Sequence, residues 1–215
     1  MGIRSWTRSR IPGSDTLYAE IRLRWLARQT PRQVEDLLKS GSLVQLDLGG
    51  GDATKAGWLT IDIDQNSDLF WDLRRGIPFP DGTVDAIYSS HFLEHLSYHD
   101  GQAVLSEARR VLKPSGTVSV CVPDARMYVD AYLGNRDLDP QRDYWEPAFV
   151  SSTGIDILNY VAYMDTEHKC MFDQEGLVER LNRAGFINAR TRDFDPAIDL
   201  VDRQFESIYA EAEKG

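Results

Sequence analysis

Residues 43 to 64 read L-V-Q-L-D-L-G-G-G-D-A-T-K-A-G-W-L-T-I-D-I-D, and this stretch decides the fold of the chain. One short apolar run ends in three consecutive glycines, and a second, Trp58 to Ile63, ends in two acids. Apolar runs this short and bounded by glycine indicate buried strands rather than helices. If the two strands are parallel neighbours, the glycine turn and the acids meet at the carboxyl edge of the sheet, where open α/β sheets bind ligands.

Residue types at this edge predict a site for a ligand that carries a ribose. Glycine lets the backbone approach a ligand closely, and a carboxylate can accept hydrogen bonds from two sugar hydroxyls. The alternative is an ordinary tight turn with surface acids. The predicted contacts in this stretch are Asp47 for a positively charged group, the turn Gly49, Gly50 and Gly51, and the strand-end acids Asp62 and Asp64.

The spacing of the stretch argues against a dinucleotide. The dinucleotide fingerprint has a third glycine and an acid about 20 residues further on. Here Thr54 stands at the third glycine, and only residues 52 to 57 separate the turn from the next strand, too few for a full crossover helix. The helix N-terminus that would hold a pyrophosphate is therefore missing. S-adenosylmethionine has a ribose, no phosphate and two positive charges that suit an acidic pocket.

Four motifs in order resemble the class I S-adenosylmethionine-dependent methyltransferases, of the type 11-like kind. They are L-D-L-G-G-G, the acidic strand end, P-F-P-D-G-T-V-D-A-I-Y-S-S-H-F-L-E-H-L, and E-A-R-R-V-L-K-P-S-G. With G-W-L-T-I-D-I-D directly after the turn, the chain looks closest to a compact subgroup often linked to cell-surface polysaccharide biosynthesis. The resemblance implies an α/β, Rossmann-like sheet of seven mostly parallel strands with an antiparallel last strand, helices on both faces, and a shortened first crossover helix.

The resemblance also implies roles for residues further along the chain. Asp72 or the backbone of Leu73 would meet the adenine amino group, and Ile63 would pack against the adenine ring. The strand end at Ser90 and His91 would lie beside the methyl-transfer centre. Asp72 could instead be a plain loop acid.

Three residues are candidates for an acid or base on the acceptor side, namely His168, His91 and Asp124, in that order. Such a group is needed only when the acceptor is a hydroxyl or a protonated amine. Asp124 could equally cap a helix that starts at Ala125, and a histidine beside a helix is commonly structural.

The segment around His91 also allows a metal reading. His91, Glu94, His95 and His99 lie at helical spacings, and H-F-L-E-H has the H-x-x-E-H form of one class of zinc peptidases. The same segment already fits the methyltransferase pattern, and no distant ligand set stands out. No metal is therefore predicted.

Composition indicates one ordinary globular domain in 215 residues, with 42% hydrophobic and 27% charged residues. No apolar run is long enough to span a membrane, and no signal peptide is expected. Cys121 and Cys170 are too few for a disulfide framework, which favours reduced thiols and a cytoplasmic location. The formal net charge of −10 argues against nucleic-acid binding. No oligomeric state is indicated.

The N-terminal segment, residues 1 to 40, is basic, with eight Lys/Arg against four Asp/Glu. Two helices are expected: one from a cap at Ser14 and Asp15 to about Arg28, and one from Thr30-Pro31 to Lys39, ended by a glycine. This extension would form a lid over the cofactor pocket, the favoured reading, or touch an anionic membrane surface. Residues 41 to 215 would form the methyltransferase domain.

An irregular acceptor-side insertion is expected at about 134–170, because residues 134 to 160 interrupt the alternation of strands and helices. Its aromatic residues, Tyr144, Trp145, Phe149 and Tyr160, suit sugar binding or form a small cluster under a loop. Elsewhere strands are expected over 67–71, 84–89, 117–122, 186–192 and 205–213, and helices over 101–112, capped by Asp100, over 125–133 and up to residue 184.

The predicted function is S-adenosylmethionine-dependent methyl transfer to a small-molecule or glycan acceptor by in-line displacement. Orientation of the acceptor, the methyl group and the sulfur can supply much of the rate enhancement. The alternatives are a non-catalytic relative that serves as a cofactor-binding module, and, with less support, a dinucleotide-dependent oxidoreductase.

Overall fold

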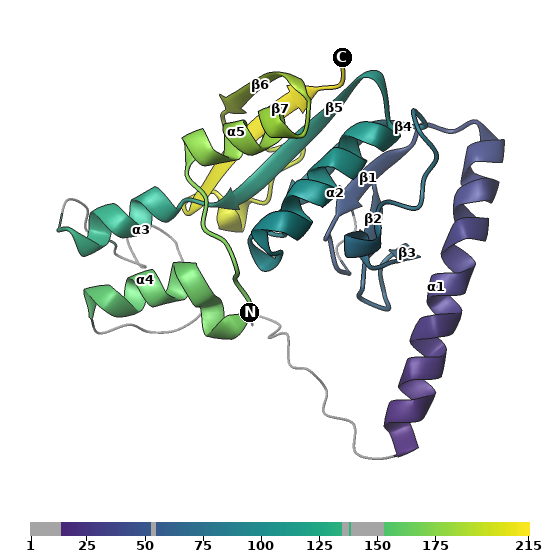
Figure 1. The fold of residues 1–215 in the computed structure, drawn as a ribbon, viewed down its shortest axis with the longest axis horizontal. Coiled ribbons are helices and arrows are strands. Elements are labelled where there is room, and N and C mark those ends of the chain that lie inside the picture. Colours follow the sequence, from purple (N-terminus) through teal and green to yellow (C-terminus); the bar gives the residue numbers. More distant parts are fainter. Residues whose placement is uncertain (1–13, 53–54, 135–137, 139–152) are drawn as a thin grey trace.

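A computed structural model describes residues 14–52, 55–134, 138 and 153–215 (Figure 1). Its sheet has seven strands in the order β3-β2-β1-β4-β5-β7-β6. The strands are β1 Gln45–Leu48, β2 Leu59–Asp62, β3 Leu69–Phe70, β4 Val84–Ser90, β5 Leu112–Pro123, β6 Ile187–Arg192 and β7 Ser207–Glu213. β7 pairs antiparallel with both of its neighbours, and the other paired strands are parallel. The predicted fold class is confirmed.

The central strands are buried, as is typical of strands in the middle of a parallel sheet. Three consecutive residues of β1 and of β2 are buried, and Leu46 and Ile61 have no exposed surface. The connection between β1 and β2 contains no helix in its described residues, as expected from its length. The glycine turn therefore leads almost directly from one strand into the next.

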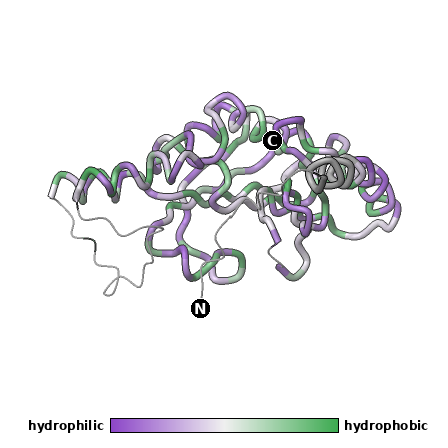
Figure 2. The backbone as a smooth tube through the Cα atoms, turned by 90° about the horizontal axis from the view of Figure 1, so that it is seen from below, coloured by the Kyte–Doolittle hydropathy of each residue, from purple (hydrophilic) through white to green (hydrophobic). Residues whose placement is uncertain are grey.

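Five α-helices are described: α1 Ser14–Ser40, α2 Tyr98–Val111, α3 Ala125–Tyr132, α4 Gly154–Tyr163 and α5 Gln174–Arg183. Short 3-10 turns, η1 Leu73–Arg75, η2 Leu93–His95, η3 Met164–Thr166 and η4 Val201–Arg203, follow or precede strands and helices. In Figure 1, α2 and α5 lie in front of the sheet, α1 runs beside β3, and α3 and α4 lie side by side at the other end. Purple and green alternate along the helical coils in Figure 2, as expected for helices with one packed face.

The two helices predicted before residue 41 form one helix, so this prediction is wrong. Pro31 lies inside α1 rather than at the start of a second helix. Thr30 is fully buried, and its hydroxyl donates to the carbonyl of Phe70 in β3 at 2.7 Å. This contact with the sheet edge holds the helix on both sides of the proline. Gly41, with φ +70°, ends the helix as predicted.

Three local predictions need correction. Ser97 rather than Asp100 caps α2, and its side chain accepts from the Asp100 backbone N–H at 3.1 Å. β5 begins at Leu112, ahead of the predicted strand over 117–122, and Ser115 inside it is a left-handed residue with φ +63°. The predicted irregular segment contains α4, whose apolar residues at helical spacing pack inward.

A second apolar cluster lies apart from the main core, between α3 and α4. It comprises Ala125, Met127, Tyr128, Tyr160 and Val161. Tyr160 thus belongs to a small cluster of its own, as one of the two readings expected. The other three aromatic residues of the insertion (144, 145 and 149) lie outside the described residues.

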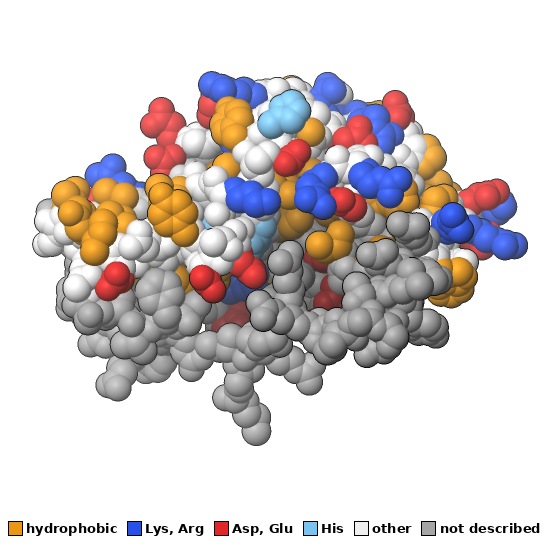
Figure 3. All heavy atoms as spheres, turned by 60° about the horizontal axis from the view of Figure 1, so that its bottom comes forward, with side chains coloured by type: hydrophobic (Ala, Val, Ile, Leu, Met, Phe, Trp, Pro, Cys, Tyr) orange, Lys and Arg blue, Asp and Glu red, His pale blue; other side chains and the backbone are white. Residues whose placement is uncertain are grey.

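The described surface carries both signs of charge. Figure 3 shows Lys/Arg and Asp/Glu side chains interspersed on one face. None of the described helices is both long and apolar enough to cross a membrane. Both cysteines are free thiols.

Candidate functional site

The glycine turn and the first strand-end acid meet at the carboxyl edge of the sheet. Leu48 of β1 pairs with Ile61 of β2, so the two strands end side by side. One carboxylate oxygen of Asp62, Oδ2, accepts from the Gly51 N–H at 3.0 Å, and the other, Oδ1, accepts from the Asp64 N–H at 3.0 Å. The predicted meeting of turn and acid is therefore present, and Asp62 also holds the turn in shape.

Each glycine of the turn has a different surrounding. A Cβ on Gly49, which has φ +75°, would lie 2.3 Å from the ring of Phe92. A Cβ on Gly50 would come within 3.2 Å of the Asp47 carboxylate. Gly51 has φ +59°, and a Cβ there would meet no described atom within 4 Å. Gly49 is thus needed for packing, while Gly51 faces open space.

A buried ion pair, Asp47 with Lys55, lies beneath the turn. Lys55 Nζ lies 3.8 Å from Asp47 Oδ2 and 3.4 Å from the centre of the Tyr88 ring. Asp47 Oδ1 and Lys55 Nζ are both buried without a hydrogen-bond partner among the described residues. Burial raises the pKa of Asp47 to about 6, against the attraction of Lys55. The pair therefore has hydrogen-bonding capacity left for a ligand.

Lys55 is a site residue that the sequence reading missed. It lies in the deciding stretch, but no motif or spacing distinguishes it from a surface lysine. Only the fold brings it over Tyr88, whose hydroxyl donates to Asp199 at 3.0 Å. Asp199 in turn binds Arg192 through two hydrogen bonds of 2.6 and 2.7 Å.

The structure places the residues expected around the nucleoside in different surroundings. The side chain of Ile63 is 53% exposed beside the turn, where it can cover a base. Asp64 accepts from the Asn66 N–H at 2.8 Å. Both carboxylate oxygens of Asp72 bind the Arg74 guanidinium at 2.8 Å, which lowers the pKa of Asp72.

Two further expectations concern the residues that follow Asp72 and end β4. The side chain of Leu73 is buried, so only its backbone could meet a ligand. Ser90 is buried at the end of β4, and its oxygens lie 3.4 Å from Arg203. Their roles remain predictions.

His91 turns the chain sharply after β4. Its φ is +49°, its Nε2 lies 2.7 Å from Ser207 Oγ, and its Nδ1 lies 3.8 Å from Glu94 Oε1. Burial lowers the pKa of His91 well below its ordinary value. Because of this turn and the separate short η2, the histidines of the segment do not share one helix, contrary to the sequence reading.

Glu94, His95 and His168 form a compact group. One possible ligand atom from each lies within 4.8 Å of the others. Glu94 is fully buried, and burial raises its pKa to about 8. Burial lowers the pKa of His95 to about 4 and also lowers the pKa of His168. The sequence reading found no distant ligand beside H-x-x-E-H, and His168 supplies one.

Asp124 serves as the N-cap of α3, the alternative that the sequence left open. Its side chain accepts from the Arg126 backbone N–H at 3.0 Å. Against the larger effect of burial, the positive charge of Arg203 favours a lower pKa of Asp47 beside the glycine turn. It also favours a lower pKa of His91 and of Glu94, so it acts on both parts of the site. The candidate site thus runs from the glycine turn to the histidine group.

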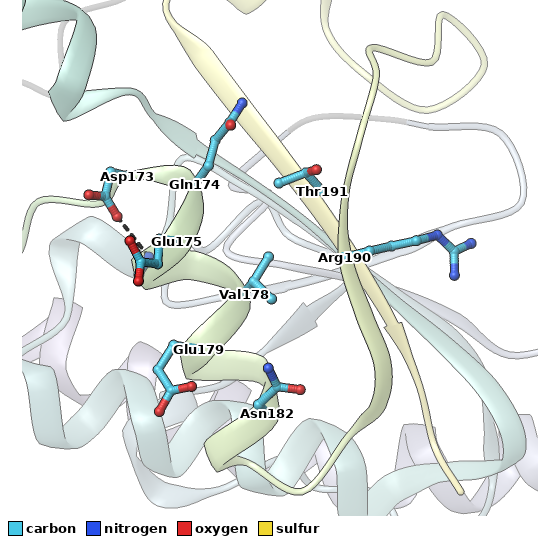
Figure 4. Close-up of a pocket in the computed structure, with 9 residues that line it drawn as sticks. Asp173, Gln174, Glu175, Val178, Glu179, Asn182, Arg190 and Thr191 are labelled. Atoms are coloured by element: carbon cyan, nitrogen blue, oxygen red, sulfur yellow. Dashed lines mark hydrogen bonds between the residues drawn. The ribbon is translucent and has the colours of Figure 1, made fainter.

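A shallow hollow of about 750 Å³ lies elsewhere, between α5 and β6 (Figure 4). Its lining includes Asp173, Glu175, Glu179 and Arg190. Asp173 caps α5, Glu179 pairs with Arg183, and Arg190 pairs with Glu211. Since Asp173, Glu179 and Arg190 already have partners and no lining residue belongs to the glycine turn, the hollow is not the candidate site.

Comparisons with known proteins give one family model and several similar folds. Residues 46–120 match the family model of a methyltransferase domain, from β1 through most of β5. No curated protein matches the chain. The fold is similar to a SAM-dependent methyltransferase from Thermotoga maritima, described as a possible histamine N-methyltransferase, with 14% identity, a TM-score of 0.50 and coverage of 94% of this chain and 96% of that chain.

A SAM dependent methyltransferase from Archaeoglobus fulgidus is similar as well. Its identity is 17%, its TM-score is 0.51, and the match covers 94% of this chain and all of that chain (100%). At such identities the likeness establishes the fold alone. The family model places the glycine turn, β2 and the end of β4 inside the matched segment.

Proposed function

We propose that this chain binds S-adenosylmethionine at the glycine turn and transfers its methyl group to a small-molecule or glycan acceptor. The observation that carries the proposal is the buried Asp47–Lys55 pair beside the turn, with one unpartnered atom on each side chain. The amino-acid end of the cofactor carries one positive and one negative group. A carboxylate and an ammonium held together match both of these groups.

The other residues of the turn fit the nucleoside. A carboxylate has about four acceptor positions, and Asp62 uses two of them on backbone N–H groups, which leaves capacity for ribose hydroxyls. Gly51 leaves room for the ligand, and the exposed side chain of Ile63 can cover the base. Since Asp72 is engaged by Arg74, we assign the adenine amino group to the backbone of Leu73 instead.

The bound cofactor supplies a methyl group on positively charged sulfur. The chain has to orient the acceptor in line with it and to exclude water, which can supply several kcal/mol. His168 keeps Nδ1 on the Val161 carbonyl at 2.8 Å and so has its other ring nitrogen available for an acceptor proton. It remains the first candidate base, ahead of His91 and Asp124, because those two are engaged by Ser207 and by the start of α3.

The acceptor class follows from the charge of the chain. The net charge of −10 and the mixed surface charge of Figure 3 suit neutral or cationic acceptors better than a nucleic acid. The proposal includes a role in polysaccharide biosynthesis and a cytoplasmic location. It also includes a peripheral membrane contact through the basic N-terminus.

Calorimetry tests the cofactor. S-adenosylmethionine should bind, while NAD and ATP should bind at least tenfold more weakly, because the turn lacks a helix N-terminus for phosphates. Asp62→Ala should abolish binding. Asp68→Ala is the control, since Asp68 lies on the same connection but accepts from Thr60. Preference for NAD or ATP would reject the proposal.

A second titration tests the amino-acid end. Lys55→Met should weaken binding of S-adenosylmethionine but leave unchanged the binding of 5′-methylthioadenosine, which lacks the amino-acid end. An equal loss for both ligands would show that Lys55 supports the turn rather than contacting the cofactor. Product formation across sugar and amine acceptors would then separate an enzyme from a binding module.

A further inference from the structure

Three side chains, Glu94, His95 and His168, converge at one end of the candidate site. Glu94 and His95 belong to η2, whereas His168 follows η3 from a distant part of the chain. One ligand atom from each lies within 4.8 Å of the other two. The two rings stand nearly at right angles, 81°, with centres 5.0 Å apart.

Both histidines have Nδ1 on a backbone carbonyl, so the same ring nitrogen is left free in each. His95 Nδ1 lies 3.2 Å from the Glu167 carbonyl, and His168 Nδ1 lies 2.8 Å from the Val161 carbonyl. A carbonyl only accepts, so in each neutral ring Nδ1 carries the hydrogen and Nε2 keeps its lone pair. Metal-binding histidines are held in this manner, with the second ring nitrogen on a carbonyl or carboxylate.

The Glu94 carboxylate has no partner for either oxygen among the described residues. The residue is 1% exposed, and His91 Nδ1, on a ring whose pKa burial lowers well below its ordinary value, lies 3.8 Å away. A buried carboxylate is normally paired with a cation or hydrogen-bonded, because desolvation of an unpartnered charge is costly. The Glu94 carboxylate is therefore suited to bind a cation at this position.

The backbone holds the group together without any ion. The N–H groups of Lys169 and Cys170 both donate to the Glu94 carbonyl, at 2.7 and 3.2 Å. With the contact of His95 to Glu167, these bonds join η2 to residues 167–170. The three side chains are thus positioned by the fold, as a binding site requires.

We propose that Glu94, His95 and His168 bind a divalent transition-metal ion of the zinc type. Two imidazole nitrogens and one carboxylate are a known donor set for zinc, and three protein ligands leave a fourth position for water or substrate. Ligands about 2.1 Å from zinc lie about 3.4 Å apart in a tetrahedron. The ion would therefore draw the side chains slightly closer than they lie here.

Metal binding here does not depend on the proposed function. Taken together with it, the ion would occupy the acceptor side, because Glu94 adjoins His91 at the end of β4. The ion would bind the Nε2 lone pair of His168, so this ring could no longer accept a proton. The ion itself would then help an acceptor hydroxyl to lose its proton.

The test is a titration of tag-free, EDTA-treated full-length protein with ZnCl₂, followed by calorimetry and by thermal unfolding. We expect one equivalent of zinc to bind and the melting temperature to rise. Cobalt, titrated in place of zinc, should give the visible absorption of a low-symmetry site. Glu94→Gln and His168→Gln should each weaken zinc binding at least tenfold.

The control is His99→Gln, because His99 is exposed and lies outside the group. It should bind zinc as the unaltered chain does. Thermal unfolding in EDTA shows whether each variant is folded, and the near-isosteric Glu94→Gln keeps the test valid if His168→Gln is not. No zinc binding by the unaltered chain, or equal binding by Glu94→Gln, would overturn the proposal. A loss of methyl transfer without a loss of zinc binding would bear on the proposed function alone.

Discussion

Gly49 and Gly51 occupy one turn and both have positive φ, yet their neighbours differ. Packing on Phe92 leaves no room for a Cβ at Gly49, while Gly51 faces open space among the described atoms. The two positions therefore separate the cost of backbone conformation from the cost of overpacking.

Gly49→Ala should lower the free energy of unfolding by about 2 to 4 kcal/mol, because strain at positive φ adds to a clash with an aromatic ring. Gly51→Ala should cost only about 1 kcal/mol, the conformational term alone. Urea denaturation measures both. Equal losses would mean that Phe92 moves aside freely.

Asp47 should make stability depend on pH in the unusual direction for an acid. Its pKa is raised by burial from 3.8 to about 6, so the folded state keeps a proton that the unfolded state has lost. Its contribution is therefore most favourable below about pH 4 and is lost as the pH rises to about 6. Relative to the unaltered chain, Asp47→Asn should gain about 3 kcal/mol between pH 4 and pH 7.

The control for this measurement is Asp72→Asn, whose effect has the opposite sign. The pKa of Asp72 is lowered by its hydrogen bonds to Arg74, so its contribution is present above the unfolded pKa and is lost on acidification. Unfolding by urea at a series of pH values compares the two variants. If the difference in unfolding free energy between Asp47→Asn and the unaltered chain does not change with pH, the pKa of Asp47 is not raised.

At the scale of elements, α1 depends on a contact at its middle. The Thr30 hydroxyl joins the helix to the carbonyl of Phe70 in β3, next to the proline that deprives the helix of one backbone hydrogen bond. The residues after this point, Val34, Leu37 and Leu38, pack on the main core. The contact thus secures the helix where its own hydrogen bonding is weakest.

Thr30→Val should lower the free energy of unfolding by about 1 to 3 kcal/mol, since the part-buried Phe70 carbonyl loses the donor that the buried Thr30 supplies. Thr83→Val is the matched control. The Thr83 hydroxyl makes a similar 2.8 Å bond to Pro80, but in an exposed turn where water can replace it. Chemical denaturation of both variants should show a loss for Thr30 alone; similar losses would mean that the helix does not rely on this contact.

The described residues form two apolar clusters, the main core around the sheet and the smaller one between α3 and α4. A small cluster with few buried residues opens more easily than a core of many. α3 and α4 should therefore be less stable than the strands that carry the glycine turn.

Hydrogen exchange followed by mass spectrometry tests this division with two identical substitutions at equally buried valines. Val161→Ala, in the small cluster, should speed exchange in α3 and α4 and leave β4 and β5 unchanged. Val120→Ala, at the centre of β5, should cost about 2 kcal/mol or more and speed exchange throughout. Faster exchange of β4 in Val161→Ala would show that the two clusters unfold together.

Much of the fold and half of the site could be predicted because they depend on local patterns. Apolar runs, glycines and strand-end acids lie within 22 residues of one another, so alternation and spacing were enough to place Asp62 against Gly51. The antiparallel position of β7 followed from the resemblance. Helix ends were less predictable, because Ser97 and Asp100 are both good caps and only the backbone selects one.

What the sequence determined by itself was the parallel sheet and the turn at its edge, since both follow from the order of short apolar runs and glycines. Only the tertiary structure decided that α1 continues through Pro31, because a contact with β3 compensates for the proline. It also decided which side chains lie next to Lys55 and His168. Lys55 meets Asp47 only because the turn between them folds back, and His168 reaches Glu94 from a distant segment, so neither contact leaves a trace in residue spacing.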